Sequence, residues 1–139
     1  MESFEIEKSV GFLMAKAYQR VFGHFRELLA PFKITPPQFA LLAFLWQEDG
    51  LSQTELAAKT EIDRTTIGGL IDRLEKLELV QRERHPNDRR VHCIFLTTYG
   101  RSLEAELRAL ALNVRERFTG HLSVHEYEQL CSLLEKLRV

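Results

Sequence analysis

The stretch from Leu51 to Thr97 constrains the fold most, because its apolar residues change there from a helical to an extended spacing. Two short amphipathic segments come first, and two alternating segments follow, separated by His85-Pro86-Asn87-Asp88. Proline and asparagine favour turns, and proline ends a strand because it has no N–H for the ladder. We therefore predict helices over 53–59 and 64–78 and strands over 80–84 and 89–96. Two helices followed by a hairpin are the elements of a winged helix-turn-helix.

Helix-start signals place further helices on both sides of this stretch. A hydroxyl residue followed three positions later by Glu or Gln is typical of a capping box, and the pattern occurs at Thr35–Gln38, Ser52–Glu55 and Ser123–Glu126. Asp63 is a further N-cap candidate. The helices are expected at about 5–30, 36–48, 53–59, 64–78, 98–118 and 124–137. The predicted fold is mostly α (an α+β winged helix-turn-helix), with six helices and a two-stranded β wing.

The helix over 64–78 has a face suited to a DNA groove. Its apolar side chains form one stripe: Ile67, Leu70, Ile71 and Leu74. The opposite face carries small residues in its first half and charged residues in its second: Thr65, Gly69, Asp72 and Lys76, flanked by Thr66, Gly68 and Arg73. Short side chains let a helix approach base edges closely, and Arg64 and Arg73 can reach phosphates or a guanine edge. Asp72 would repel phosphate, so we expect Lys76, one turn on, to neutralise it.

The hairpin tip carries Asp88-Arg89-Arg90. An arginine at such a tip can enter the narrow minor groove, where the negative potential is strongest. Asp88 is expected to accept hydrogen bonds from an arginine and so fix its rotamer. The alternative is an ordinary solvated charged turn, but its position directly after a helix of the reading type favours DNA contact. With a net charge of −1 and this one small basic patch, the chain suits a protein that makes few phosphate contacts per subunit and binds as a dimer.

The terminal helices carry more apolar surface than a small winged core can cover. Their stripes at helical spacing contain Phe4, Val10, Leu13, Ala17, Val21, Phe25 and Leu28; Leu103, Leu107, Leu110, Val114 and Phe118; and Val124, Tyr127, Leu130, Cys131, Leu134 and Leu137. A second copy of the chain is the natural cover; the alternative is a monomer whose terminal helices fold onto the core. We therefore expect an N-terminal dimerisation helix (1–34), a winged helix-turn-helix DNA-binding domain (35–97) and C-terminal dimerisation helices (98–139).

The chain resembles the MarR family of winged helix-turn-helix transcription regulators. The matching words are Leu51-Ser52-Gln53-Thr54-Glu55-Leu56-Ala57, Asp63-Arg64-Thr65-Thr66-Ile67, Leu70-Ile71-Asp72-Arg73-Leu74-Glu75, Leu79-Val80 with Arg82, and Asp88-Arg89-Arg90 with Leu96-Thr97. The last of these is the most specific. Gly68-Gly69 departs from the pattern, because relatives often carry a larger residue at one of these positions.

The resemblance implies a triangular homodimer that is joined by the first, fifth and sixth helices. It implies DNA contacts from Arg64, Thr65, Thr66 and Arg73, with Gly68 and Gly69 on the same face. It also implies that Arg90 enters the minor groove, with Asp88 in support and Arg89 nearby. Family members usually repress transcription by covering a promoter palindrome, and they leave it when a small, often phenolic or aromatic, effector binds.

Other function classes find little support in the sequence. His121 and His125 are four residues apart, but a helix start lies between them and no third metal ligand follows at a suitable spacing. Neither a glycine-rich phosphate loop nor a nucleophile elbow occurs. We therefore expect no enzyme activity, no metal and no cofactor. Without a signal-peptide pattern or an apolar run of about 18 residues, the expected location is the prokaryotic cytoplasm, on the nucleoid, with no membrane partner.

Two alternative functions stay open at this point. One is an architectural or anti-silencing DNA binder without a ligand. The other is a redox sensor, for which Cys93, near the wing arginines, is a better candidate than Cys131, which is expected to be a small buried apolar residue. An aromatic cleft is also conceivable, from Phe12, Phe22, Phe32, Phe39, Phe44 and Trp46. Aromatic residues at helical spacing are more often core than ligand site, so ligand-binding residues stay unassigned.

Overall fold

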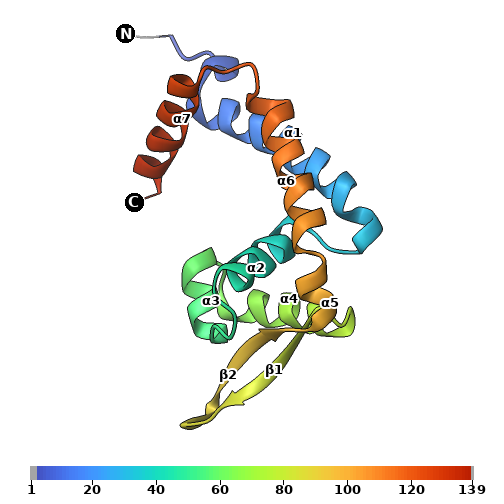
Figure 1. The fold of residues 1–139 in the computed structure, drawn as a ribbon. Coiled ribbons are helices and arrows are strands. Elements are labelled where there is room, and N and C mark those ends of the chain that lie inside the picture. The colour runs from blue at the N-terminus through green and yellow to red at the C-terminus, as the bar shows by residue number, and fades with distance from the viewer. Residues whose placement is uncertain (1–2, 139) are drawn as a thin grey trace.

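The computed structural model describes residues 3–138, which form a winged lobe below a set of longer helices (Figure 1). Met1, Glu2 and Val139, the outer ends of the predicted domains 1–34 and 98–139, lie outside the described residues. The elements in chain order are η1 (Ile6–Lys8), α1 (Val10–Leu29), η2 (Ala30–Phe32), α2 (Pro36–Gln47), α3 (Gln53–Thr60), α4 (Arg64–Lys76), β1 (Val80–His85), β2 (Asp88–Leu96), α5 (Thr98–Ser102), α6 (Glu104–Thr119) and α7 (Val124–Leu137).

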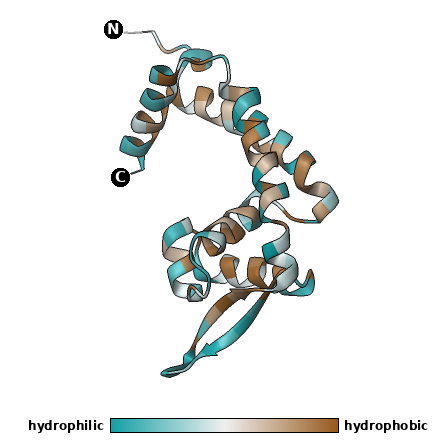
Figure 2. Cartoon of the chain, viewed as in Figure 1, coloured by the Kyte–Doolittle hydropathy of each residue, from teal (hydrophilic) through white to brown (hydrophobic). Residues whose placement is uncertain are grey.

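The core of the winged lobe lies between α2, α3, α4 and the base of the β1–β2 hairpin, here called the wing. Its completely or almost completely buried side chains include Leu41, Leu42, Leu45, Leu56, Ile67, Ile71, Leu74 and Ile94. Figure 2 shows hydrophobic residues on the inner faces of these helices and hydrophilic residues toward the wing tip. Since burial of one such side chain contributes roughly 1.5–3 kcal/mol, this cluster is the main reason why the lobe holds together.

The wing is an antiparallel pair that is anchored at its base. Val80 pairs with Leu96, and His85 pairs with Asp88 at the tip, after an irregularity between Arg84 and His85. The Ile94 N–H donates to the Leu51 carbonyl at 2.9 Å, so the segment before α3 extends the sheet. The predicted strands are confirmed, each one residue longer than expected, and the loop between them consists of Pro86 and Asn87.

Two predicted helices are divided, each for a local reason. The helix expected over 98–118 breaks at Leu103, because Trp46 Nε1–H donates to the Gly100 carbonyl at 3.1 Å and the Ser102 hydroxyl donates to the Tyr99 carbonyl at 2.6 Å. In a continuous helix both carbonyls would accept hydrogen bonds from backbone N–H groups four residues further on. The first helix begins at Val10 rather than near residue 5, since Ser9 is its N-cap and a separate short turn precedes it.

The terminal helices differ in how far their own chain covers them. α1 packs along α6, and Leu107 and Val114 of α6 are buried there. Much of the 103–118 stripe is therefore covered within the chain itself, by α1 and by the core, which Leu110 contacts. α7 buries none of its described residues.

Within residues 3–138, no single helix is long and apolar enough to cross a membrane. Residues 10–32 and 36–47 reach the required length and composition only when taken together, with a bend of 73° between them. The second of these segments contains three leucines of the buried core.

Candidate nucleic-acid interface

The exposed face of α4 is fixed by its N-cap and its buried stripe. Asp63 accepts hydrogen bonds from the Thr66 N–H at 2.8 Å and the Thr66 hydroxyl at 2.9 Å, and these bonds lower the pKa of the Asp63 carboxyl. Ile67, Ile71 and Leu74 are buried. The predicted contact residues of α4 point away from the core. Gly68 is half-buried, and the other five are exposed: Arg64, Thr65, Thr66, Gly69 and Arg73.

The glycine pair of α4 leaves the middle of this face flat. A Cβ at Gly69 would have no atom within 4 Å, whereas a Cβ at Gly68 would lie 3.4 Å from Gln53 Nε2. Gly69 is therefore not required by packing within residues 3–138, and it leaves open space outside the helix. Two glycines in a helix lower its stability by about 2 kcal/mol relative to two alanines. The flat surface of α4 therefore comes with a less stable helix.

The wing tip presents Arg90 in a fixed position. Arg90 Nε donates to Asp88 Oδ1 at 3.1 Å, its Nη2 donates to Oδ2 at 3.3 Å, and its backbone N–H donates to Oδ1 at 3.0 Å. The bonds from Arg90 lower the pKa of the Asp88 carboxyl. Although held at one edge, the Arg90 side chain is 91% exposed. The predicted support of an arginine by Asp88 is therefore present, and Arg89 is exposed beside it.

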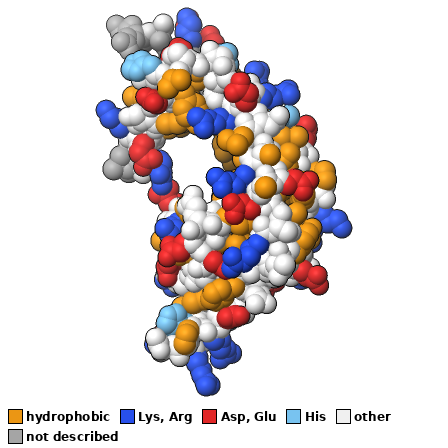
Figure 3. Space-filling model, in the orientation of Figure 1, with side chains coloured by type: hydrophobic (Ala, Val, Ile, Leu, Met, Phe, Trp, Pro, Cys, Tyr) orange, Lys and Arg blue, Asp and Glu red, His pale blue; other side chains and the backbone are white. Residues whose placement is uncertain are grey.

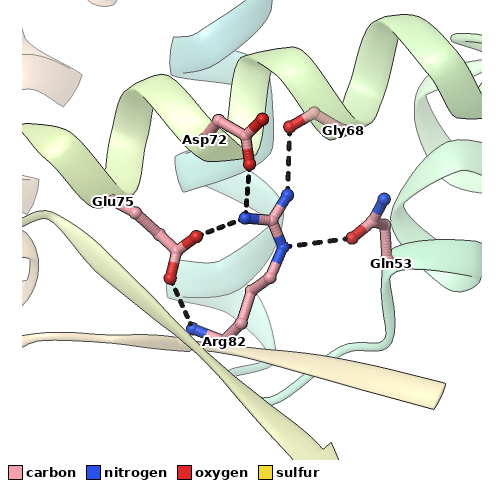
Figure 4. Close-up of polar contacts among 5 residues, drawn as sticks. All are labelled: Gln53, Gly68, Asp72, Glu75 and Arg82. Carbon is pink, nitrogen blue, oxygen red and sulfur yellow. Dashed lines mark hydrogen bonds and ion pairs between the residues drawn. The ribbon is translucent and has the colours of Figure 1, made fainter. Parts of the chain in front are cut away.

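Arg82 ties the wing to α4 (Figure 4). Its Nη1 donates to Asp72 at 2.6 Å and to Glu75, and its Nη2 donates to the Gly68 carbonyl at 3.0 Å. Its Nε donates to Gln53 Oε1 at 3.4 Å, and its backbone N–H donates to Glu75 Oε2 at 3.2 Å. A single guanidinium, only 19% exposed, thus joins β1 to both α4 and α3.

This network corrects one prediction and supplies a residue that sequence reasoning missed. Asp72 pairs with Arg82, not with Lys76, because the guanidinium reaches it from the wing. The available signal was the strand period: Arg82 lies two residues after the buried Val80, so it faces the lobe, where Asp72 and Glu75 stand three residues apart on α4. The wing and α4 therefore form one rigid surface, with its basic tip at the lower end of the molecule (Figure 3).

Two cavities adjoin this surface and the helices above it. The first, here called the wing-side pocket, measures about 290 Å³ and lies between α3, α4 and β2; Gln53, Thr54, Arg64, Arg82, Arg90, Val91 and His92 line it. The second, here called the aromatic cavity, measures about 450 Å³ and lies between α1, α2 and α3. Its lining includes Tyr18, Phe22, Phe25, Phe44, Lys59 and Thr60.

The aromatic residues singled out in the sequence separate into groups. Phe22 and Phe44 line the aromatic cavity, and Lys59 Nζ lies 5.8 Å from the centre of the Phe44 ring. Phe39 and Trp46 instead line a third cavity between α2 and α6, of about 300 Å³. Phe32 packs against the core.

The two cysteines have the reverse of the expected exposures. Cys93 is buried on β2, where Ser52 forms a bridge with it, and Cys131 is exposed on α7, which buries none of its described residues. The proposed reactive site near the wing arginines therefore lacks access. Within residues 3–138, no group of three or more His, Cys, Asp or Glu side chains is placed to bind a metal.

Known proteins share both the sequence pattern and the fold. A model of the MarR family matches residues 34–92. Over 96% of its length the chain is 34% identical to the HTH-type transcriptional repressor NicR of Pseudomonas putida, of which it covers 85%. It is also 29% identical, over 92% of its length and 78% of the relative, to the putative transcriptional regulatory protein for the hcr operon of Thauera aromatica.

Two solved structures have the same arrangement of elements. One is BpsR of Bordetella bronchiseptica, whose DNA binding is regulated by 6-hydroxynicotinic acid; its TM-score is 0.91 at 30% identity, covering 99% of this chain and 98% of that chain. The other is the transcriptional repressor CouR bound to a 23-mer DNA duplex, with a TM-score of 0.89 at 33% identity, covering 100% and 99%.

Proposed function

The chain belongs to the MarR family of transcriptional regulators, and we propose that it is a homodimeric repressor that covers a palindromic promoter site and leaves it when a small aromatic effector binds. The surface formed by α4 and the wing is the main observation in support of DNA binding. The flat exposed face of α4 and the exposed Arg90 finger are held in one geometry by Arg82. The solved DNA complex of CouR, at 33% identity, supports the same use.

On this proposal α4 lies in the major groove and the wing tip in the adjacent minor groove. Base edges are read by the small residues of α4, and Arg90 enters the minor groove while Asp88 holds it. The proposed contact residues are Arg64, Thr65, Thr66, Gly68, Gly69, Arg73, Arg89 and Arg90, with Asp88 in support.

The unburied helix α7 supports the homodimer. Exposed large apolar residues gather on η1, α1 and α7: Ile6, Val10, Leu13, Met14, Val124, Leu130, Leu133, Leu134 and Leu137. So much apolar surface on one helical region is typical of a protein–protein interface. A two-fold symmetric pair would place two α4 helices about 34 Å apart, one turn of DNA, which is why the site should be a palindrome.

The aromatic cavity is the proposed effector site. Four aromatic rings line the cavity. Among the residues that the structure describes, Lys59 is the one charged residue in the lining. Its Lys59–Ile62 edge leads directly into Asp63, the N-cap of α4. A ligand there would therefore move α4, and it can weaken DNA binding only by preferring the moved state. CouR has also been solved with p-coumaroyl-CoA, at 31% identity, and BpsR responds to 6-hydroxynicotinic acid.

Replacement of Lys59 by Met tests this site. If the effector is an aromatic carboxylate, loss of the ammonium should raise the concentration needed to release DNA by about tenfold, as expected for one lost charged hydrogen bond. The measurement is DNA release during titration with 6-hydroxynicotinate and with coumarate. Lys33→Met, which removes an exposed ammonium outside the cavity, is the matched control. Equal release curves for both variants would place the effector elsewhere.

Selection of binding sites from fragmented genomic DNA tests the function as a whole. Purified protein is used at about 150 mM salt, where non-specific binding is suppressed. Recovery of one palindrome with half-sites a helical turn apart is the expected result. Recovery of fragments without a common motif would contradict a site-specific regulator and favour an architectural DNA binder.

Arg90→Ala should weaken DNA binding roughly tenfold. Each dimer would lose two cationic groove contacts, so the slope of log K against log salt should become shallower by about two. Anisotropy titrations at several salt concentrations measure both quantities. Arg108→Ala, which removes an exposed arginine of α6, should change neither; an unchanged slope in Arg90→Ala would remove Arg90 from the interface.

A further inference from the structure

The wing-side pocket lies between the two parts of the proposed DNA-contact surface, α4 and the wing tip. It lies behind Arg90 and beside Arg64, between the first turn of α3, the start of α4 and strand β2. The ridge between a major groove and the adjacent minor groove is the sugar–phosphate backbone. If α4 enters one groove and the wing enters the other, that backbone has to cross this pocket.

The charges of the pocket suit a phosphate. Arg64, Arg82 and Arg90 contribute to its lining, and within residues 3–138 no Asp or Glu does. The acids that pair with Arg82 and Arg90 are Asp72, Glu75 and Asp88, which lie outside the lining. Among the ion pairs that residues 3–138 form, none involves Arg64. Arg64 therefore brings an uncompensated positive charge to the pocket.

Arg82 fixes the orientation of the Gln53 amide. A guanidinium has donors only, so the amide atom that faces Arg82 Nε at 3.4 Å must be the oxygen. The amide nitrogen is then turned the other way, toward the surface of α4, where a Cβ at Gly68 would lie 3.4 Å from it. Gln53 thus presents a donor, and not an acceptor, at the wall of the pocket.

We propose that the wing-side pocket seats one DNA backbone phosphate in each half-site, with the Gln53 amide and the Arg64 guanidinium as its donors. Arg82 is a positioning residue, because four of its five side-chain N–H donors are engaged with Gln53, Asp72, Glu75 and Gly68. This inference rests on the proposed function and adds a contact to it. The phosphate would set the register of α4 along the groove, since phosphate contacts position a protein while base contacts specify the sequence.

Methylphosphonate substitution tests the pocket, because it removes the charge of one phosphate at a time. The probe is the duplex recovered by site selection, with one neutral linkage per half-site moved along the backbone. Wild-type protein should lose about tenfold in affinity at the linkage that crosses the pocket. Gln53→Glu keeps the acceptor for Arg82 but turns a carboxylate oxygen toward the phosphate, so it should bind the natural duplex at least about 30-fold more weakly.

The order of the affinities for the natural and the substituted duplex distinguishes a phosphate contact at Gln53 from a general loss of DNA binding. Gln53→Glu should bind more tightly to the duplex that is neutral at that one linkage than to the natural duplex, whereas wild type shows the opposite order. Gln53→Ala keeps the Arg64 contact, so it should still prefer the natural duplex, by a smaller factor than wild type. Gln47→Glu, which adds the same charge at an exposed position at the end of α2, should behave as wild type.

Two results would overturn the proposal. One is a wild-type protein that tolerates neutral linkages at every position between the two grooves. The other is a Gln53→Glu protein, folded as judged by its thermal transition, that loses the same factor on natural and substituted duplexes. Both leave site-specific binding intact, whereas failure to recover any site would instead contradict the proposed function.

Discussion

Replacement of Leu134 by Asp is expected to leave the protein monomeric and to lower its affinity for a palindromic site at least about 100-fold, because the two half-sites are then no longer bound by one linked pair of lobes. Leu134 is 42% exposed on a helix that buries none of its described residues. A carboxylate placed there would be buried without a partner in any dimer that uses this face. The winged core, in which α7 takes no part, should keep its thermal transition.

Ser132→Asp is the matched control for that variant. It adds the same charge to α7, but two residues away and therefore on nearly the opposite face of the helix. Sedimentation velocity should give a dimer for Ser132→Asp and for the unmodified protein, and a monomer for Leu134→Asp. A Leu134→Asp protein that sediments as a dimer and binds DNA normally would remove this face of α7 from the interface.

Arg82→Met is expected to have a comparable effect on DNA binding through a different cause. The change leaves Asp72 and Glu75 without their partner, next to the surface that faces DNA, and releases the wing from α4. We expect an affinity loss of about 100-fold, and a fall in the free energy of unfolding of about 1–3 kcal/mol, since charged hydrogen bonds to a partly exposed group are lost.

Two causes could lower the affinity of Arg82→Met: repulsion between DNA and the unpaired carboxylates of Asp72 and Glu75, or a changed orientation of the wing. Removal of the two carboxylates distinguishes them. Adding Asp72→Asn and Glu75→Gln to Arg82→Met removes the two negative charges but does not restore the link to the wing. If repulsion dominates, anisotropy titrations should show that most of the affinity returns; if the wing orientation dominates, it should stay low. Arg101→Met, which breaks the exposed pair with Asp49 instead, should bind DNA normally. Normal binding by Arg82→Met itself would contradict the positioning role.

The parts of the fold that were predicted correctly are those that local patterns determine. The exposed face of α4 follows from four apolar residues at helical spacing, and the wing follows from alternation on both sides of Pro86-Asn87. The support of Arg90 by Asp88 was predictable as well, because the two residues are close in sequence and chemically complementary.

The features that were missed depend on residues that are distant in sequence. The break at Leu103 arises because Trp46, 54 residues before Gly100, takes its carbonyl. Gly100 itself permits a close approach, since a Cβ there would lie 2.1 Å from the Leu79 carbonyl oxygen. Arg82 likewise finds Gln53, Asp72 and Glu75 only after the lobe has folded. Spacing within one helix therefore suggested Lys76 as the partner of Asp72, and the tertiary structure supplied Arg82.

We expect this chain to read a DNA sequence as a dimer. The most direct test compares the affinity of the purified protein, at about 150 mM salt, for the duplex recovered by site selection and for a scrambled duplex of equal length. A site-specific regulator should bind the recovered duplex at least about 1,000-fold more tightly. A ratio near one, with binding that falls steeply as salt is added, would show a purely electrostatic interaction and contradict sequence-specific binding by this chain.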